Sequence, residues 1–130
     1  MEFQSLSPNI GVANVNDTVK FYTEMFGFHL TMSVPKDESG TLQWAMMTNG
    51  KVNIMFQEIQ NLLEEYPQLK SRSTTATLTF YVKMKNISEL YNKVKDTEYL
   101  TTEMHKTFYG ADEFAVFDNN GYVLTITEGE

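Results

Sequence analysis

Cysteine is absent from this chain of 130 residues, and long apolar runs and basic runs are missing as well. The lack of cysteine excludes disulfide bonds, thiolate metal ligands and thiol nucleophiles. Ten basic and 17 acidic residues give a formal charge of −7, and no basic segment is present to neutralise nucleic-acid phosphates. No segment approaches the ~18 apolar residues of a membrane span, and no basic stretch followed by an apolar run marks a signal peptide. We therefore expect a cytoplasmic protein that binds neither nucleic acid nor membrane.

The chain does contain an internal repeat. At an offset of 72 residues, Val12, Asn14, Val15 and Val19 align with Met84, Asn86, Ile87 and Tyr91. At an offset of 70 residues, Gln43-Trp44-Ala45 aligns with Glu113-Phe114-Ala115, and Ile54, Phe56 and Glu58 align with Leu124, Ile126 and Glu128. A long repeat that occurs only twice indicates two copies of one supersecondary unit around a shared space.

Each copy predicts the order β-α-β-β-β. Alternation and turn residues predict strands at about 6–13, 28–34, 41–48 and 52–58, and again at about 75–83, 98–105, 111–118 and 121–127. Asn14 with Asp17, and Asn86 with Glu89, predict the two helix N-termini, and Gly27 ends the first helix. We expect one α+β domain over 1–130, with module one at about 5–58, a linker with a short helix before Pro67 at about 59–73, and module two at about 74–128.

Two sets of residues carry a family resemblance. The first set is Val12-Ala13-Asn14-Val15-Asn16, Phe21-Tyr22 and Phe26-Gly27-Phe28, and the second is Tyr109-Gly110, Phe114-Ala115-Val116 and Asp118-Asn119-Asn120-Gly121-Tyr122. They resemble the opening and closing motifs of the vicinal oxygen chelate superfamily, which includes glyoxalase I, extradiol dioxygenases, methylmalonyl-CoA epimerase and the bleomycin and fosfomycin resistance proteins. Asn119 departs from the usual Asp-Pro-x-Gly of the closing motif. The resemblance implies two tandem βαβββ modules whose mixed sheets curve around a central pocket.

The resemblance also implies where a metal would be held, namely by His, Gln or Glu on the first and last strands of each module. In this chain these positions fall on Ser7, Met55, Thr79 and Thr125, or on Gln57 in place of Met55 after a two-residue slip. Neutral hydroxyls bind divalent ions weakly compared with imidazole or carboxylate. The two histidines, His29 and His105, fall outside these strands. We expect no catalytic metal and no cofactor.

The face opposite the helices is predicted to be neutral and hydrogen-bonding, which is typical of a small-molecule pocket. An outer face with β-favouring threonines is the alternative. The candidate ligand-binding residues on or near this face are Ser7, Asn9, Trp44, Met55, Gln57, Thr79, Tyr81, Phe108, Tyr109 and Thr125. Phe114 is a further candidate for stacking, whereas Glu58, Asp112, Glu113 and Glu128 are expected to be solvated. No catalytic base is expected on the face.

By resemblance, the main hypothesis is a small-molecule binding protein of the bleomycin resistance type, which sequesters a cationic or aromatic compound and so confers antibiotic resistance. The alternative is a metal-dependent lyase or isomerase of the glyoxalase I type, whose ligands would include Gln57, Glu58, Glu128 or His105. A third possibility is an interaction module that acts through its dimer interface. A homodimer is expected, with module pairing within a chain or across chains left open.

Overall fold

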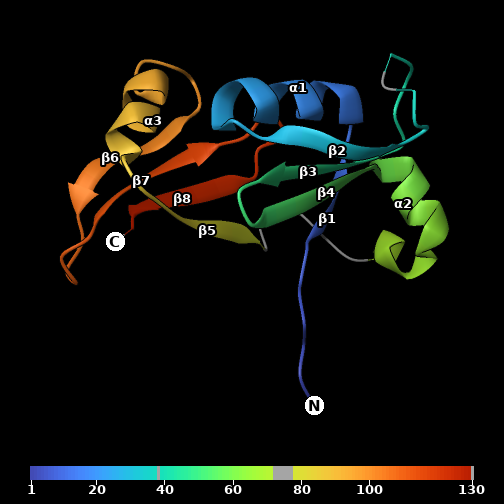
Figure 1. Cartoon of the computed structure of the whole chain (residues 1–130), viewed down its shortest axis with the longest axis horizontal. Helices are drawn as coiled ribbons and strands as arrows, with labels where there is room; N and C mark the ends of the chain where they lie inside the picture. Colours follow the sequence, from blue (N-terminus) through green and yellow to red (C-terminus); the bar gives the residue numbers. More distant parts are fainter. Residues whose placement is uncertain (38, 72–77, 130) are drawn as a thin grey trace. The chain divides into compact units, whose positions relative to one another are not determined.

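The computed structural model describes residues 1–37, 39–71 and 78–129 (Figure 1). The chain divides into two compact units, Met1–Ser73 and Thr74–Glu130. Each unit contains its own four-stranded sheet. None of the helices in the described residues has the length and apolarity that a membrane crossing requires.

The first unit contains strands β1 to β4. Its elements are β1 (Asn9–Val12), α1 (Val15–Phe26), β2 (His29–Val34), β3 (Trp44–Asn49), β4 (Val52–Glu58), α2 (Ile59–Glu65) and the 3-10 helix η1 (Pro67–Ser71). The strand order is β1-β4-β3-β2, in which β1 runs parallel to β4 and the other neighbours are antiparallel. Helix α1 contacts β2, β3 and β4 and lies across one face of the sheet (Figure 1).

The second unit repeats this arrangement. Its elements are β5 (Thr79–Met84), α3 (Ile87–Val94), β6 (Leu100–Lys106), β7 (Asp112–Phe117) and β8 (Val123–Glu128). The strand order is β5-β8-β7-β6, with β5 parallel to β8 and the rest antiparallel. The predicted α+β fold of two βαβββ modules with mixed sheets is therefore confirmed.

Several strands begin later than predicted; β3, for example, begins at Trp44 and not at about 41. Strand β1 begins at Asn9, later than predicted, because Pro8 has no N–H to donate; its carbonyl still accepts a hydrogen bond from the Met55 amide at 2.8 Å. Strand β5 begins at Thr79, and the predicted strand residues 75–77 lie outside the described part of the chain.

Helix α1 begins and ends as its sequence predicts. Asn14 is extended at φ −142°, and its Oδ1 accepts a hydrogen bond from the Asp17 amide at 2.9 Å. Gly27 ends the helix in the left-handed conformation, at φ +71°. The buried helix residues are Val15, Thr18 and Tyr22, and the Tyr22 ring lies 4.8 Å from the Phe56 ring of β4. Helix α1 thus packs its apolar stripe on the sheet.

Helix α3 begins differently, and the predicted capping pair of Asn86 with Glu89 is wrong. Asn86 is left-handed at φ +59° and makes no side-chain capping hydrogen bond. Its backbone amide and that of Ile87 instead donate to the two carboxylate oxygens of Glu128, each at 3.0 Å. The cap therefore comes from the last strand, 41 and 42 residues away. In the first unit, the aligned residue Glu58 likewise accepts hydrogen bonds from the amides of Gln60 and Asn61 in the first turn of α2.

The cores lie between the helices and the predicted apolar sheet faces. The buried residues of these faces are Ile10, Val12, Ile54, Phe56, Leu124 and Ile126, while Phe80 and Val82 are half-buried. In the second unit, the Tyr91 ring of α3 lies 5.1 Å from the Phe114 ring of β7. Phe114 is fully buried, so it belongs to the core and does not line the opposite face as expected.

Candidate functional site

Strand register places four predicted site residues on one face of the first sheet. Trp44 pairs with Gln57 across β3 and β4, and Asn9 pairs with Met55 across β1 and β4. Neighbouring residues in a ladder point to the same side, and the adjacent Phe56 packs against α1. Asn9, Trp44, Met55 and Gln57 therefore lie opposite the helix.

A chain of amide hydrogen bonds crosses this face. The Asn9 Nδ2 donates to the Gln57 Oε1 at 2.8 Å, and the Gln57 Nε2 donates to the Asn61 Oδ1 of α2 at 2.7 Å. Gln57 is buried, at 5% exposure, so these bonds satisfy its polar atoms and fix its orientation. The result is a rigid neutral surface that joins β1, β4 and α2.

A cleft of about 330 Å³ opens over these amides. Its lining consists of Asn9, Val34, Gln43, Trp44, Gln57, Asn61 and Glu65. The volume is at the lower end of the ~300–1,000 Å³ of small-molecule sites. The cleft offers one indole for stacking, several amides for hydrogen bonding and one carboxylate. Three of the ten predicted site residues, Asn9, Trp44 and Gln57, come together here.

The second unit places a carboxylate at the position that Trp44 occupies in the first. Glu113 pairs with Thr127 on β8, as Trp44 pairs with Gln57 on β4. Gln57 and Thr127 are repeat partners, so Glu113 corresponds to Trp44. The predicted alignment of Trp44 with Phe114 is therefore wrong by one residue. This shift puts Glu113 on the same face as Tyr81 and Thr125, which pair across β5 and β8.

Glu113 is the centre of a hydroxyl cluster, and the expectation that it is solvated is wrong. The residue is 7% exposed. Its Oε2 accepts a hydrogen bond from the Tyr81 hydroxyl at 3.0 Å and another from the Tyr109 hydroxyl. The Tyr109 bond, joined by bonds from Tyr81 and Thr127, lowers the pKa of Glu113 despite burial. The same carboxylate raises the pKa of Tyr109. Sequence reasoning missed Glu113 because the repeat was aligned one residue out of register.

Tyr109 reaches Glu113 from the turn between β6 and β7. Gly110 adopts φ +87° in this turn, and its amide donates to the Thr107 carbonyl at 3.0 Å. Phe108 is fully exposed, and its ring lies 5.0 Å from that of Tyr109 in an edge-to-face arrangement. The turn thus holds two of the predicted aromatic residues at the surface of the second unit.

The four positions that the family resemblance assigns to metal ligands carry side chains that bind divalent metal ions poorly. Ser7 precedes β1, Met55 lies on β4, Thr79 opens β5 and Thr125 lies on β8. None has an imidazole, carboxylate or thiolate, so this donor set does not fit zinc, nickel, iron or manganese. Among the described residues, no three His, Cys, Asp or Glu side chains gather as a metal site would require.

The alternative ligands already have partners. Glu58 and Glu128 accept hydrogen bonds from helix N-termini, and the Gln57 amide is held by Asn9 and Asn61. His105 Nδ1 lies 2.9 Å from the Glu103 carbonyl oxygen. A metal bound by these side chains would therefore have to displace existing hydrogen bonds, including those of the two caps.

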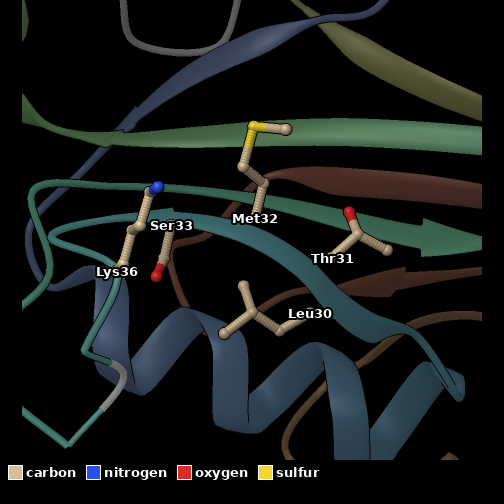
Figure 2. Close-up of a pocket in the computed structure, with 5 residues that line it drawn as sticks. All are labelled: Leu30, Thr31, Met32, Ser33 and Lys36. Carbon is tan, nitrogen blue, oxygen red and sulfur yellow. The ribbon is translucent and has the colours of Figure 1, made fainter.

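A second cavity, of about 260 Å³, lies along β2, the edge strand of the first sheet. Figure 2 shows Leu30 on the side of β2 that faces the helix and Met32 on the other side, so the cavity wraps the strand edge. Thr31, Ser33 and Lys36 complete its lining. None of the predicted site residues lines this cavity.

Comparison with known proteins agrees with the observed fold. The family model described as Glyoxalase/Bleomycin resistance protein/Dioxygenase superfamily matches residues 6–126. Among curated proteins, no match is found.

Solved structures with this fold cover nearly the whole chain. A protein of unknown function from Agrobacterium tumefaciens str. C58 is 14% identical with a TM-score of 0.78, covering 100% of this chain and 97% of that one. TioX from Micromonospora sp. ML1 is 16% identical with a TM-score of 0.70, covering 98% and 97%. The bleomycin-binding protein of bleomycin-producing Streptomyces verticillus, in complex with copper(II)-bleomycin, is 16% identical with a TM-score of 0.64, covering 100% and 99%. At these identities the likeness shows a common fold.

Proposed function

Because the chain belongs to the glyoxalase/bleomycin resistance protein/dioxygenase superfamily, we propose that it is a small-molecule binding protein that sequesters a planar, cationic compound. The observation that carries this proposal is the Trp44 cleft, where an indole lies beside fixed amides and a carboxylate. In this proposal the ligand leaves the protein chemically unchanged.

Each part of the cleft has a role in binding. The Trp44 indole is half-buried, which leaves ring surface for a planar ligand to cover. The amides of Asn9, Gln57 and Asn61 are held by one another, so a ligand meets donors and acceptors that are already oriented. The exposed carboxylate of Glu65, which also lines the cleft, favours a ligand with positive charge. The net charge of −7 acts in the same direction.

The donor chemistry favours binding over catalysis. A lyase or isomerase of the glyoxalase type would need a Lewis acid and a general base. The family's ligand positions do not fit a metal, as described above. Glu113 is a carboxylate on the predicted site face of its own unit, but its lowered pKa makes it a weak base.

The structural neighbours add support at the level of the family. The bleomycin-binding protein of Streptomyces verticillus shares the fold and binds copper(II)-bleomycin. We also propose that sequestration of this compound confers antibiotic resistance. The titration below distinguishes the classes of compound that bind.

The test is a calorimetric titration with bleomycin, with proflavine, which is a planar cation, and with acridone, which is planar and uncharged. We expect saturable binding of a cationic compound, weaker binding of acridone, and quenching of Trp44, the single tryptophan. Trp44→Leu should weaken binding by about tenfold, because stacking and apolar contact are lost. Phe3→Leu, an exposed aromatic before β1, is the matched control and should bind as the wild type does.

Two results would contradict the proposal. One is the absence of saturable binding by any compound of the set. The other is turnover of the methylglyoxal–glutathione adduct by protein supplied with zinc or nickel, which would favour the lyase alternative.

A further inference from the structure

The buried carboxylate of Glu113 forms no ion pair with a lysine or arginine among the described residues. Its partners are the hydroxyls of Tyr81, Tyr109 and Thr127. Lys106 of the neighbouring strand β6 pairs with Asp112 instead, at 2.9 Å. His105, the cross-strand neighbour of Glu113, has its Nδ1 at the Glu103 carbonyl. Within the described part of the chain, the negative charge of Glu113 is thus stabilised by hydroxyl donors and by the nearby His105, and not by an ion pair.

Buried carboxylates are normally paired with a cation or bound to a metal, because burial disfavours an isolated charge. Here the hydroxyl donors, Tyr109 first, hold the carboxylate in its ionised form. The raised pKa of Tyr109 keeps that phenol neutral. The cluster therefore presents a single negative charge at neutral pH, which attracts a cation from outside the chain.

The aromatic rings around this charge are open to solvent. Tyr81 is 59% and Tyr109 is 55% exposed, and Phe108 is fully exposed beside Tyr109. A phenol that donates to a carboxylate becomes more electron-rich at its oxygen and ring, because hydrogen bonds in series polarise one another. Electron-rich ring faces attract cations, most strongly quaternary and other organic ammonium groups.

We propose that Glu113, Tyr81 and Tyr109, with Phe108 as an outer wall, form a binding site for an organic cation that carries an ammonium or amidinium group. The carboxylate supplies the charge, and the rings supply contact with the apolar surface of the cation. The site lies wholly in the second unit and shares no residue with the Trp44 cleft, so it extends the proposed function and does not depend on it.

The composition of the cluster favours an organic cation over the alternatives. A divalent metal ion prefers several carboxylate or carbonyl oxygens, and this cluster has one carboxylate. A purely structural clasp for the turn would need only a neutral acceptor such as Gln, which avoids the cost of burying a charge.

The test uses choline and its uncharged isostere 3,3-dimethyl-1-butanol, which have similar shape and differ in charge. Binding to the full chain is followed by the ring NMR signals of Tyr81 and Tyr109. We expect choline to shift these signals saturably and the isostere to bind at least about tenfold more weakly. Glu113→Gln, which keeps the shape of the side chain and removes its charge, should weaken choline binding by about tenfold. Asp112→Asn removes one charge from the same strand at an exposed position and should change binding by less than about twofold.

Equal binding of choline and its isostere by the wild type would overturn the proposal, and this comparison stands even where Glu113→Gln fails to fold. Unchanged choline binding by folded Glu113→Gln would do the same, since it would leave Glu113 with a structural role. Trp44→Leu separates the two sites: choline binding should persist in it, and a loss there would place the cation in the cleft and refute this site.

Discussion

At the scale of single residues, Trp44 and Glu113 occupy corresponding positions and give their units different chemistry. Trp44 contributes an indole to a cleft lined by neutral amides. Glu113 contributes a charge that two phenols and a threonine hydroxyl surround. The duplication therefore preserves the position of a side chain on the sheet face opposite the helix and changes its chemical character.

The hydroxyl of Tyr109 should control the ionisation of Glu113. Its hydrogen bond is the largest cause of the lowered Glu113 pKa, so Tyr109→Phe should raise that pKa towards its ordinary value. A carboxylate with a lowered pKa stabilises the folded state above its unfolded pKa, and this stability is lost as pH falls through the folded pKa. In Tyr109→Phe the folded pKa of Glu113 lies closer to the unfolded one, so this acid-linked loss of stability should be smaller and should be complete at a higher pH. The measurement is the Glu113 carboxyl ¹³C shift and the urea midpoint between pH 7 and pH 3.

Tyr66→Phe is the control for this prediction, because Tyr66 is an exposed tyrosine of the first unit. It should leave the Glu113 titration unchanged. An unchanged Glu113 pKa in Tyr109→Phe would mean that the turn does not hold Tyr109 against the carboxylate in solution.

At the scale of elements, the two helices that follow the first strands start by different means. Asn14 caps α1 with its own side chain, whereas Asn86 provides a left-handed backbone and leaves the cap to Glu128. Asn is well suited to both tasks, since it caps helices and also tolerates positive φ. The same residue at aligned positions thus has two separate roles.

Replacement by serine should distinguish these roles. Serine caps a helix as well as asparagine does, so Asn14→Ser should change the free energy of unfolding by only a few tenths of a kcal/mol. Serine tolerates the left-handed region less well than asparagine does, so Asn86→Ser should lower the free energy of unfolding by about 1 kcal/mol. Urea denaturation followed by circular dichroism measures both variants. Equal effects at the two positions would argue that Asn86 also acts as a side-chain cap.

At the scale of the whole molecule, we predict a homodimer. Light scattering coupled to gel filtration should give about twice the chain mass of 15.0 kDa, at a concentration well above that used for binding. A mass equal to that of one chain would refute the dimer and would exclude pairing of the modules across chains. A dimer would leave both modes of pairing open.

The sequence by itself determined the kind and order of the strands and α-helices, but not the 3-10 helix η1. Strands such as β4 and β8 alternate between apolar and polar residues, so their helix-facing sides could be read directly from Ile54 and Phe56 or from Leu124 and Ile126. Asn14 and Gly27 likewise define the limits of α1 through local backbone chemistry. These signals are local, so they can be read from the sequence without knowledge of the fold.

Only the tertiary structure decided which side chains meet. Strand β7 is buried at four successive positions, Glu113 to Val116, so its own pattern does not reveal which face is which. The pairing of Glu113 with Thr127 settles the face, and it brings the carboxylate to Tyr81 from 32 residues away. The cap of α3 by Glu128 is equally non-local. Register and long-range hydrogen bonds depend on how strands pair, and no local propensity encodes that pairing.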